Sequence, residues 1–402
     1  MQYPQRFSDL PEYAFPRLRR LLGDVPAGGP DIHMTIGEPK HALPDQIGPA
    51  IAANLAGFSK YPPNEGAPEL RLAISGWLAR RYGVELDADT EILPLNGTRE
   101  GLFNAAIALC PENKSSRQPV ILMPNPFYQC YGTAALAVGA EPIYLSATAR
   151  TGFLPDFNSV PADILARTTL AYICSPANPQ GTVATEAYWR DLIALAETHD
   201  FRILADECYC EIYRDTPPPG VLQVVRTMGA DPERVLAFHS LSKRSSAPGL
   251  RSGFVAGGPG AIRAMLQLRS YSGAPLPLPL QHAAASLWND EKHVEESRAL
   301  YREKFAIADR ILGGLAGYTS PQAGFFLWLG VADGERAAVE IYRRTGVRVL
   351  PGAYLSRDAA DGTNPGAAYI RIALVAEARE VETGLTAIRN TLEDMPELKG
   401  TD

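Results

Sequence analysis

Residues 240–253 read SLSKRSSAPGLRSG, and this stretch gives the strongest indication of both fold and chemistry. Lys243 follows an apolar run that ends at His239, two serines lie just before it, and Arg251 comes eight residues later. A lysine after a strand is most often a solvated cation. Serine hydroxyls and a guanidinium beside one amine can instead hold a phosphate dianion. An amine beside a phosphate suggests a covalent link to pyridoxal phosphate.

In this stretch the sequence resembles the class I/II pyridoxal-phosphate aminotransferases, which belong to the fold-type I group. The resemblance implies that Lys243 carries the cofactor and that Ser240, Ser242 and Arg251 bind its phosphate. The freed Lys243 amine would then move a proton between the substrate carbon and the cofactor. We expect burial and neighbouring cations, such as Arg244 or Arg251, to lower the pKa of Lys243 for this task.

The next motif lies upstream, where residues 201–209 read FRILADECY and predict a buried strand that ends at Asp206. A pyridine nitrogen stays protonated beside a buried carboxylate, and the resemblance assigns that role to Asp206. It also assigns to Tyr209 a catalytic role through a hydrogen bond to the ring oxygen of the cofactor. Taken alone, Asp206 is more simply explained as the cap of a following helix. The order of the motifs favours the cofactor role.

Two predicted turns add further cofactor contacts. The apolar segment 168–175 is followed by PANPQG, whose Asn178-Pro pair is first of all a turn signal. The resemblance implies that Asn178 donates to the ring oxygen of the cofactor. Residues 96–99, NGTR, join a short strand to a helix, and free N–H groups at such a junction suit a phosphate as well as an ordinary turn. The resemblance implies phosphate contacts from Gly97, Thr98 and Arg99.

A lone charge in an apolar strand predicts where the substrate binds. Residues 368–374 read AYIRIAL, and arginine is seldom buried without a partner. Arg371 could pair with a substrate α-carboxylate through two hydrogen bonds, or it could lie on an exposed edge strand. The resemblance favours the carboxylate role. It also places Gly37, in the IGEP segment near the start of the chain, at the same carboxylate.

Two tyrosines receive roles from the resemblance alone. Tyr128 follows the apolar run 120–123, and its ring would cover one face of the cofactor and border the substrate together with Asn178. Tyr61 begins a YPPNEG segment, and its hydroxyl would reach the phosphate bound by a neighbouring subunit. The resemblance therefore implies a homodimer with shared active sites.

The alternation of elements predicts the fold. From about residue 90 to 260, β-type runs alternate with amphipathic helical stretches, which indicates an α/β fold with a mostly parallel sheet and helices on both faces. A proline-rich linker, a long helix over 281–312 and short strands of a smaller α+β domain follow. We expect an N-terminal arm that packs with the small domain or a partner subunit, a large cofactor-binding domain and a small C-terminal domain, over residues 1–45, 46–275 and 276–402.

Composition excludes several classes of function. The chain has 402 residues and a formal net charge of −7, and it carries no basic run, which argues against nucleic acid or a membrane surface as a partner. No apolar run approaches the ~18 residues of a spanning helix, and the first 23 residues do not resemble a signal peptide. Five cysteines without a paired framework indicate a reducing compartment, and six scattered histidines predict no metal site. We therefore expect a cytoplasmic protein.

Within the family, the resemblance is strongest to the succinyldiaminopimelate aminotransferases of bacterial lysine biosynthesis, in motifs such as LNGTRE at 95–100, PNPFYQ at 124–129 and VLPG at 349–352. It implies amino transfer between L-glutamate and N-succinyl-2-amino-6-oxopimelate. Segment 274–280 lacks the arginine that aspartate aminotransferases of this fold carry, which argues against plain aspartate specificity. The alternatives are an aminotransferase of aspartate, alanine or aromatic amino acids, a pyridoxal-phosphate C–S β-lyase, and a non-catalytic regulator on the same fold.

Overall fold

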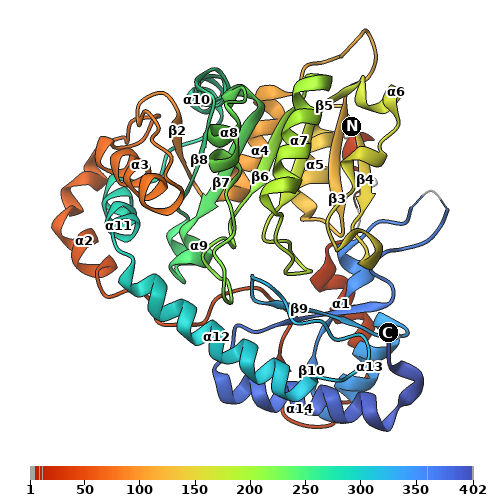
Figure 1. Cartoon of the computed structure of the whole chain (residues 1–402). Coiled ribbons are helices and arrows are strands. Elements are labelled where there is room, and N and C mark those ends of the chain that lie inside the picture. The colour runs from red at the N-terminus through yellow and green to blue at the C-terminus, as the bar shows by residue number, and fades with distance from the viewer. Residues whose placement is uncertain (1–4, 9, 11, 360, 401–402) are drawn as a thin grey trace.

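The computed structural model describes residues 5–8, 10, 12–359 and 361–400. Its centre is a seven-stranded sheet (Figure 1). In spatial order the strands are β2 (Ile92–Leu95), β8 (Gly253–Gly257), β7 (Val235–Ser240), β6 (Arg202–Asp206), β5 (Thr168–Cys174), β3 (Val120–Asn125) and β4 (Glu141–Ser146). Strand β8 runs antiparallel to both of its neighbours, and the pairs from β7 to β4 are parallel. The predicted α/β fold with a mostly parallel sheet is confirmed.

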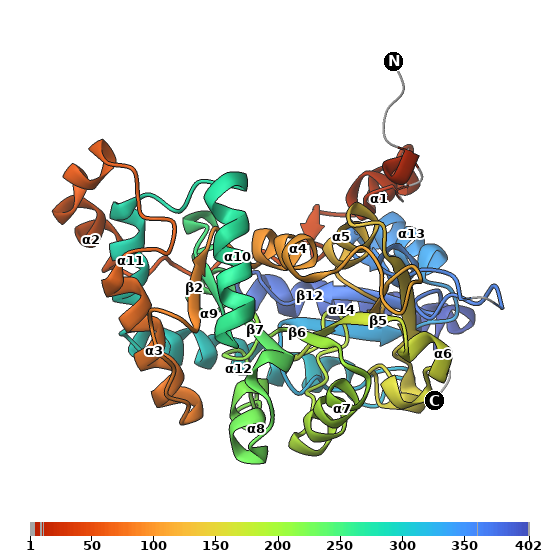
Figure 2. The ribbon, with the colours of Figure 1, turned by 90° about the horizontal axis from the view of Figure 1, so that it is seen from above.

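Helices cover both faces of this sheet, as Figure 2 shows from above. One face carries α4 (Thr98–Leu109), α5 (Gln129–Ala137) and α10 (Pro259–Ser272), and the other carries α7 (Glu186–His199) and α8 (Val221–Met228). Most of the central strands are buried along their whole length. This burial explains why they read as continuous apolar runs rather than as alternating patterns.

The C-terminal part of the chain forms a second core around a small antiparallel sheet. Its strand order is β11 (Leu350–Pro351), β12 (Tyr369–Ala373) and β9 (Phe326–Gly330). The sheet is accompanied by α12 (Lys292–Leu312), α13 (Gly334–Thr345) and α14 (Ala378–Asp394). From the N-terminal segment, α1 (Ala14–Leu22) packs on α13, and β1 (Ile32–His33) pairs with β10 (Val347–Arg348). The boundaries of the three domains stay our proposal.

Five further α-helices lie among the described residues. They are α2 (Ile47–Ala53), α3 (Pro68–Tyr82), α6 (Ala162–Leu165), α9 (Leu241–Arg244) and α11 (Leu278–Trp288). Helix α11 packs on α2 and α3. Among the described residues, none of the helices combines the length and the apolar character that a membrane crossing requires.

The single long helix expected over 281–312 is wrong, because the chain breaks between α11 and α12 at residues 289–291. Two arginines bind carbonyl groups at the break. Arg244 donates to the Asp290 carbonyl oxygen at 3.1 Å, and Arg80 donates to the Trp288 carbonyl oxygen at 2.7 Å. These side chains satisfy carbonyl groups at the end of α11, where a helix leaves its last carbonyls without partners.

Candidate active site

The predicted site residues meet at the carboxyl ends of the parallel strands. Asp206 ends β6, Lys243 lies in the short helix α9 directly after β7, and Asn178 follows β5. Parallel strands deliver the residues that follow them to one edge of a sheet. There they line a crevice of about 510 Å³. The predicted residues among its lining are Gly37, Thr98, Arg99, Tyr128, Asn178, Asp206, Tyr209, Ser240, Ser242, Lys243, Arg251 and Arg371.

Lys243 points its amine toward the loop from the N-terminal segment. Its Nζ donates to the Gly37 carbonyl oxygen and lies 5.3 Å from the centre of the Phe325 ring. Burial lowers the pKa of Lys243 to about 8, and the positive charge of Arg371 acts in the same direction. We expected Arg244 or Arg251 to be the cation that lowers this pKa. That expectation is wrong for Arg244, whose guanidinium is directed elsewhere.

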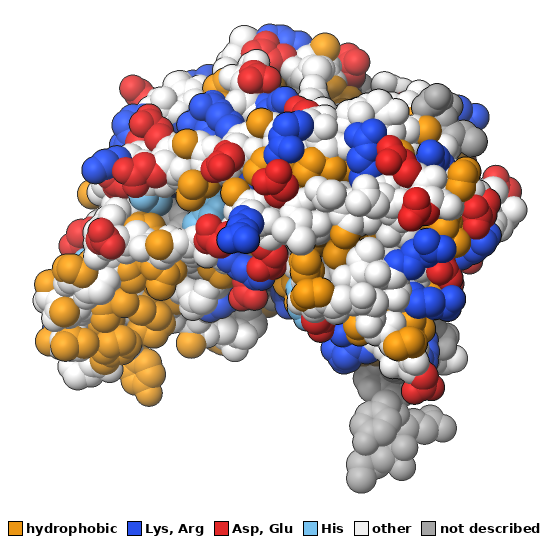
Figure 3. Space-filling model, turned by 90° about the horizontal axis from the view of Figure 1, so that it is seen from below, with side chains coloured by type: hydrophobic (Ala, Val, Ile, Leu, Met, Phe, Trp, Pro, Cys, Tyr) orange, Lys and Arg blue, Asp and Glu red, His pale blue; other side chains and the backbone are white. Residues whose placement is uncertain are grey.

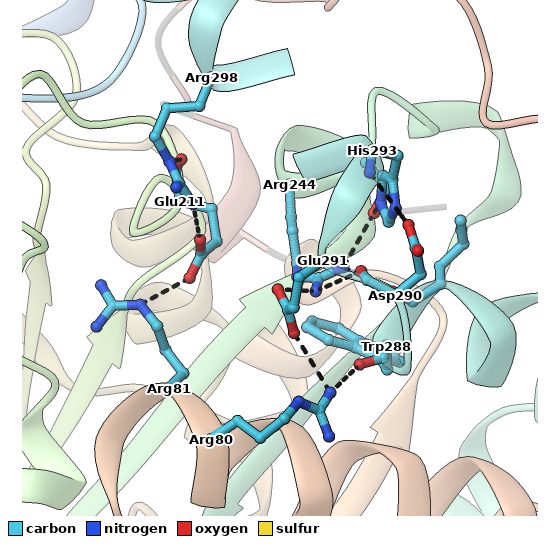
Figure 4. Close-up of polar contacts among 11 residues, drawn as sticks. Arg80, Arg81, Glu211, Arg244, Trp288, Asp290, Glu291, His293 and Arg298 are labelled. Carbon is cyan, nitrogen blue, oxygen red and sulfur yellow. Dashed lines mark hydrogen bonds and ion pairs between the residues drawn. The ribbon is translucent and has the colours of Figure 1, made fainter. Parts of the chain in front are cut away.

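Arg244 anchors the lysine-bearing helix to the start of α12 (Figure 4). The residue is 3% exposed, and its guanidinium donates to the Leu287 carbonyl oxygen at 2.8 Å and pairs with Glu291 Oε2 at 2.9 Å. It also lies 5.0 Å from the centre of the Trp288 ring. These contacts hold the backbone of α9 in place, because a buried guanidinium is costly to leave without partners. Arg244 therefore positions its neighbour Lys243.

A second polar cluster in Figure 4 ties α3 to α12. The buried carboxylate of Glu211 accepts from Arg81 Nε at 2.8 Å and pairs with Arg298 of α12 at 2.5 Å. Glu211 lies only five residues after Asp206. The loop that follows β6 is thus held from two sides, which limits its movement at the floor of the crevice.

Asp206 has the surroundings that a protonated pyridine nitrogen requires. The residue is 5% exposed, and its carboxylate accepts from the Tyr131 hydroxyl at 2.8 Å and from the Cys208 backbone N–H at 3.3 Å. Burial raises the pKa of Asp206, whereas these hydrogen bonds oppose the rise. A positively charged ring nitrogen beside it would favour the ionised form. The site therefore fits a pyridinium group.

Tyr131 is a site residue that the sequence reasoning missed. It lies on α5, three residues after Tyr128, and its ring stacks on Tyr172 at 4.5 Å with an interplanar angle of 7°. The stack aims the Tyr131 hydroxyl at Asp206. Tyr128 lies just before α5 with an extended backbone, so helical spacing does not relate the two tyrosines, and the sequence reasoning had no signal for the contact with Asp206.

The residues assigned to the phosphate form a cradle at the first turn of α4. Gly97 has a φ of 83°, and a Cβ atom built on it would lie 2.1 Å from Nη2 of Arg251. Only glycine therefore lets the guanidinium lie against this turn. Thr98, Ser240 and Ser242 are buried beside it. The N–H groups at the start of a twelve-residue helix, three hydroxyls and one guanidinium suit a dianion.

Arg371 lies in the middle of the small sheet, between β11 and β9, so the alternative of an exposed edge strand is wrong. Its Nη2 donates to the Thr35 carbonyl oxygen at 2.7 Å and its Nη1 to Asn178 Oδ1 at 3.2 Å. Its buried Nε has no partner among the described residues. Burial lowers the pKa of Arg371 to about 10. An unpartnered buried donor that lines the crevice fits a carboxylate.

The other predicted residues differ in how close they lie to the crevice. Arg99 donates through Nε to the Tyr128 hydroxyl, and its contact with a phosphate stays a prediction. Burial raises the pKa of Tyr128 to about 12, so the hydroxyl stays protonated. Tyr209 is buried with its ring 5.3 Å from that of Phe325. Tyr61 is fully exposed, and it lies outside the crevice of its own chain.

Comparison with known proteins identifies the family. The sequence profile described as "Aminotransferase class I and II" matches residues 30–388. The chain is a class I/II aminotransferase. Its cofactor is pyridoxal 5'-phosphate, which supplies an electron-accepting ring when bound. Lys243, Asp206, Tyr209, Asn178 and the phosphate cradle are the residues that we propose to hold it.

Two proteins more than 30% identical to the chain, and a third that shares its fold, serve for comparison. An LL-diaminopimelate aminotransferase of Dehalococcoides mccartyi is 31% identical over 97% of this chain and 99% of its own length. The structure of an aminotransferase from Neisseria meningitidis is 39% identical and covers 96% of this chain and 99% of its own, with a TM-score of 0.92. A probable N-succinyldiaminopimelate aminotransferase of Thermus thermophilus shares the fold at 24% identity, covers 94% of this chain and 100% of its own, and has a TM-score of 0.83.

Substitution of Arg371 tests its assigned contact in the aminotransferase. We expect Arg371→Ala to raise KM for every amino-acid substrate, because each of them carries an α-carboxylate. A charge-assisted pair contributes roughly 1.5–3 kcal/mol, so the increase should exceed about tenfold. Steady-state kinetics of both half-reactions measure this effect. Damage to one half-reaction alone would show that Arg371 does not bind the group that all substrates share.

Proposed function

We propose that this aminotransferase moves an amino group between L-glutamate and N-succinyl-2-amino-6-oxopimelate, and so serves diaminopimelate and lysine biosynthesis. The observation that carries the proposal is a second cavity of about 680 Å³, which shares Arg99, Phe127, Tyr128 and Gln129 with the catalytic crevice. Such a volume exceeds what the side chain of aspartate or alanine would fill. A substrate with a long distal part is therefore favoured over these shorter amino acids.

The roles of the residues follow from their positions. Arg371 binds the α-carboxylate and so orients the substrate. This matters because effective catalysis requires a fixed geometry between the substrate and the catalytic groups. The amine of Lys243, with a pKa of about 8, can take up and return a proton near neutral pH. Asp206 would keep the ring nitrogen of a bound cofactor protonated, and the cofactor would supply the electron-accepting chemistry.

A second candidate substrate is LL-diaminopimelate itself. The curated relative from Dehalococcoides mccartyi bears the name of an LL-diaminopimelate aminotransferase. The two substrates share a seven-carbon skeleton and differ at the distal nitrogen, which is a charged amine in one and a succinylated amide in the other. The relatives therefore support the diaminopimelate skeleton, and the choice between the two forms rests on the distal end of the site.

A steady-state screen of amino donors against 2-oxoglutarate tests the proposed function. The donors are N-succinyl-LL-diaminopimelate, LL-diaminopimelate, aspartate, alanine and phenylalanine, and the product measured is L-glutamate. We expect the highest kcat/KM for the succinylated donor. Equal or higher values for a short donor would overturn the proposal. Release of ammonia and pyruvate from a cysteine conjugate, without glutamate, would instead indicate a β-lyase.

We also propose a homodimer with shared active sites. Three large apolar side chains, Leu55, Phe58 and Tyr61, are 56%, 55% and 101% exposed in and after the 3-10 turn Leu55–Ser59. Figure 3 shows hydrophobic side chains gathered over this end of the molecule, beside α2. Contiguous exposed apolar surface marks an interface. This exposure supports a role for Tyr61 in the site of a partner subunit.

A subunit-mixing experiment tests the shared site. Subunits with Tyr61→Phe are mixed with subunits with Lys243→Ala, and each parent is weakly active or inactive. If Tyr61 serves the partner, every heterodimer has one site with both lesions and one site with neither. Activity should then exceed that of the Tyr61→Phe parent. If activity does not recover although mass spectrometry verifies subunit exchange, Tyr61 does not act in the site of the partner subunit.

A further inference from the structure

The second cavity has an arginine at its wall that the predicted chemistry does not use. Arg357 follows the 3-10 turn Gly352–Leu355 of the small domain and lines this cavity. Its backbone is held from the other domain, because the buried amide of Asn125 donates to the Arg357 carbonyl oxygen at 2.8 Å and accepts from the Arg357 N–H at 2.9 Å. The backbone of Phe127 also donates to the Leu355 carbonyl oxygen at 3.0 Å. These backbone hydrogen bonds therefore hold Arg357 at the wall of the second cavity.

Among the described residues, Arg357 forms hydrogen bonds only through its backbone, and its side chain has no such partner and no ion pair. Arg99 lines the same cavity, and among the described residues its side chain donates only through Nε, toward Tyr128. The phosphate contact predicted for Arg99 needs only its backbone N–H in the first turn of α4, so its two terminal nitrogens stay available. The one carboxylate among the described lining residues is Glu100. It is occupied by Arg269, 3.3 Å away, and by Asn104 Nδ2, at 3.0 Å. The cavity thus carries uncompensated positive charge.

We propose that Arg357 and Arg99 form a subsite for the distal carboxylate of a long amino-acid substrate. The inference rests on the proposed function, since it concerns the far end of the same substrate. Guanidinium groups bind carboxylates through paired N–H donors, so Arg357 and Arg99 in one cavity select an anionic end. Arg251, the third arginine in the described lining, is the one that we assign to the phosphate. Phe103, Leu136 and Tyr144 supply an apolar wall in the same cavity, against which methylene groups can pack.

The charge of the subsite distinguishes the two candidate substrates. The free distal ammonium of LL-diaminopimelate would lie among guanidinium groups without an available carboxylate in the described lining of this cavity. Repulsion between this ammonium and the guanidinium groups opposes the binding of LL-diaminopimelate. The succinylated substrate has no distal ammonium and adds a further carboxylate. Glu38, an exposed acid, lines the catalytic crevice near Lys243 and not the second cavity. The subsite therefore favours the succinylated form.

Binding of unreactive acids to the holoenzyme tests the subsite without any turnover. The probes are pimelate, with a carboxylate at each end of seven carbons, and heptanoate, with one carboxylate, and calorimetry gives each Kd. We expect pimelate to bind about tenfold or more tightly than heptanoate. In Arg357→Met this ratio should fall toward one, and Arg357→Lys should restore part of it. The matched control is Arg379→Met, which removes an exposed arginine on α14.

The outcomes separate the subsite from the proposed function. An Arg357→Met enzyme that keeps the full preference for pimelate, with an unchanged melting temperature, would overturn the subsite. A wild-type enzyme that shows the Arg357-dependent preference but does not use N-succinyl-LL-diaminopimelate would overturn the proposed substrate and leave the subsite intact. A higher kcat/KM for LL-diaminopimelate than for its succinylated form would contradict the charge selection.

Discussion

Replacement of Lys243 by alanine is expected to abolish transamination while leaving the fold intact. The amine is the nucleophile that we assign to the cofactor link and the base that we assign to proton transfer, so its loss removes two functions at once. General acid–base catalysis alone contributes roughly 10²–10⁴-fold. Burial lowers the pKa of Lys243 to about 8, which means that the charged amine does not stabilise the folded chain. Its removal should therefore leave the fold intact.

Three measurements check this result. The rate of glutamate formation should vanish, the visible absorbance of the covalently bound cofactor should disappear, and the melting temperature should change little. The matched control is Lys292→Ala on α12, whose side chain is 82% exposed and, within the described part of the chain, pairs only with Glu296 at 3.8 Å. A fully active Lys243→Ala enzyme would show that Lys243 is not the residue that binds the cofactor.

Replacement of Asp206 by asparagine is expected to leave the cofactor bound but to remove most of the activity. The amide keeps the shape of the side chain and can still accept from the Tyr131 hydroxyl, 2.8 Å from the carboxylate. It loses the negative charge that keeps a ring nitrogen protonated. Removal of one preorganised electrostatic partner costs roughly 10²–10³-fold in kcat. Because the phosphate cradle lies on other elements, binding of the cofactor should persist.

The measurements are kcat and the cofactor content of the purified variant. Asp215→Asn is the matched control, since that carboxylate is 90% exposed and pairs weakly with Arg214 at 3.8 Å. An unchanged kcat in Asp206→Asn would mean that Asp206 serves only to cap the turn after β6. Loss of the cofactor together with kcat would instead indicate that the charge holds the ring in place.

Local patterns in the sequence determined much of the fold and of the candidate site. The alternation of apolar runs and helical stretches predicted the mostly parallel sheet, because strands that are buried on both faces must be apolar throughout. Residues that follow parallel strands meet at one edge of the sheet, and Asp206, Asn178 and Lys243 line one crevice there. Arg371 attracted attention because a buried arginine needs a partner, and its contact with a substrate carboxylate stays a prediction.

Tertiary structure decided the contacts between distant segments. The helix expected over 281–312 breaks where Arg244, more than 40 residues earlier, binds the Asp290 carbonyl. The contact from Tyr131 to Asp206 spans 75 residues, and the clamp from Asn125 to Arg357 spans 232. Periodicity and propensity report only the local preference of the chain, whereas such contacts arise after the sheet has brought separate segments together. The sequence by itself therefore determined the family, the fold and the cofactor chemistry. Only the folded chain decided which cation lies near Lys243, and which arginines line the second cavity.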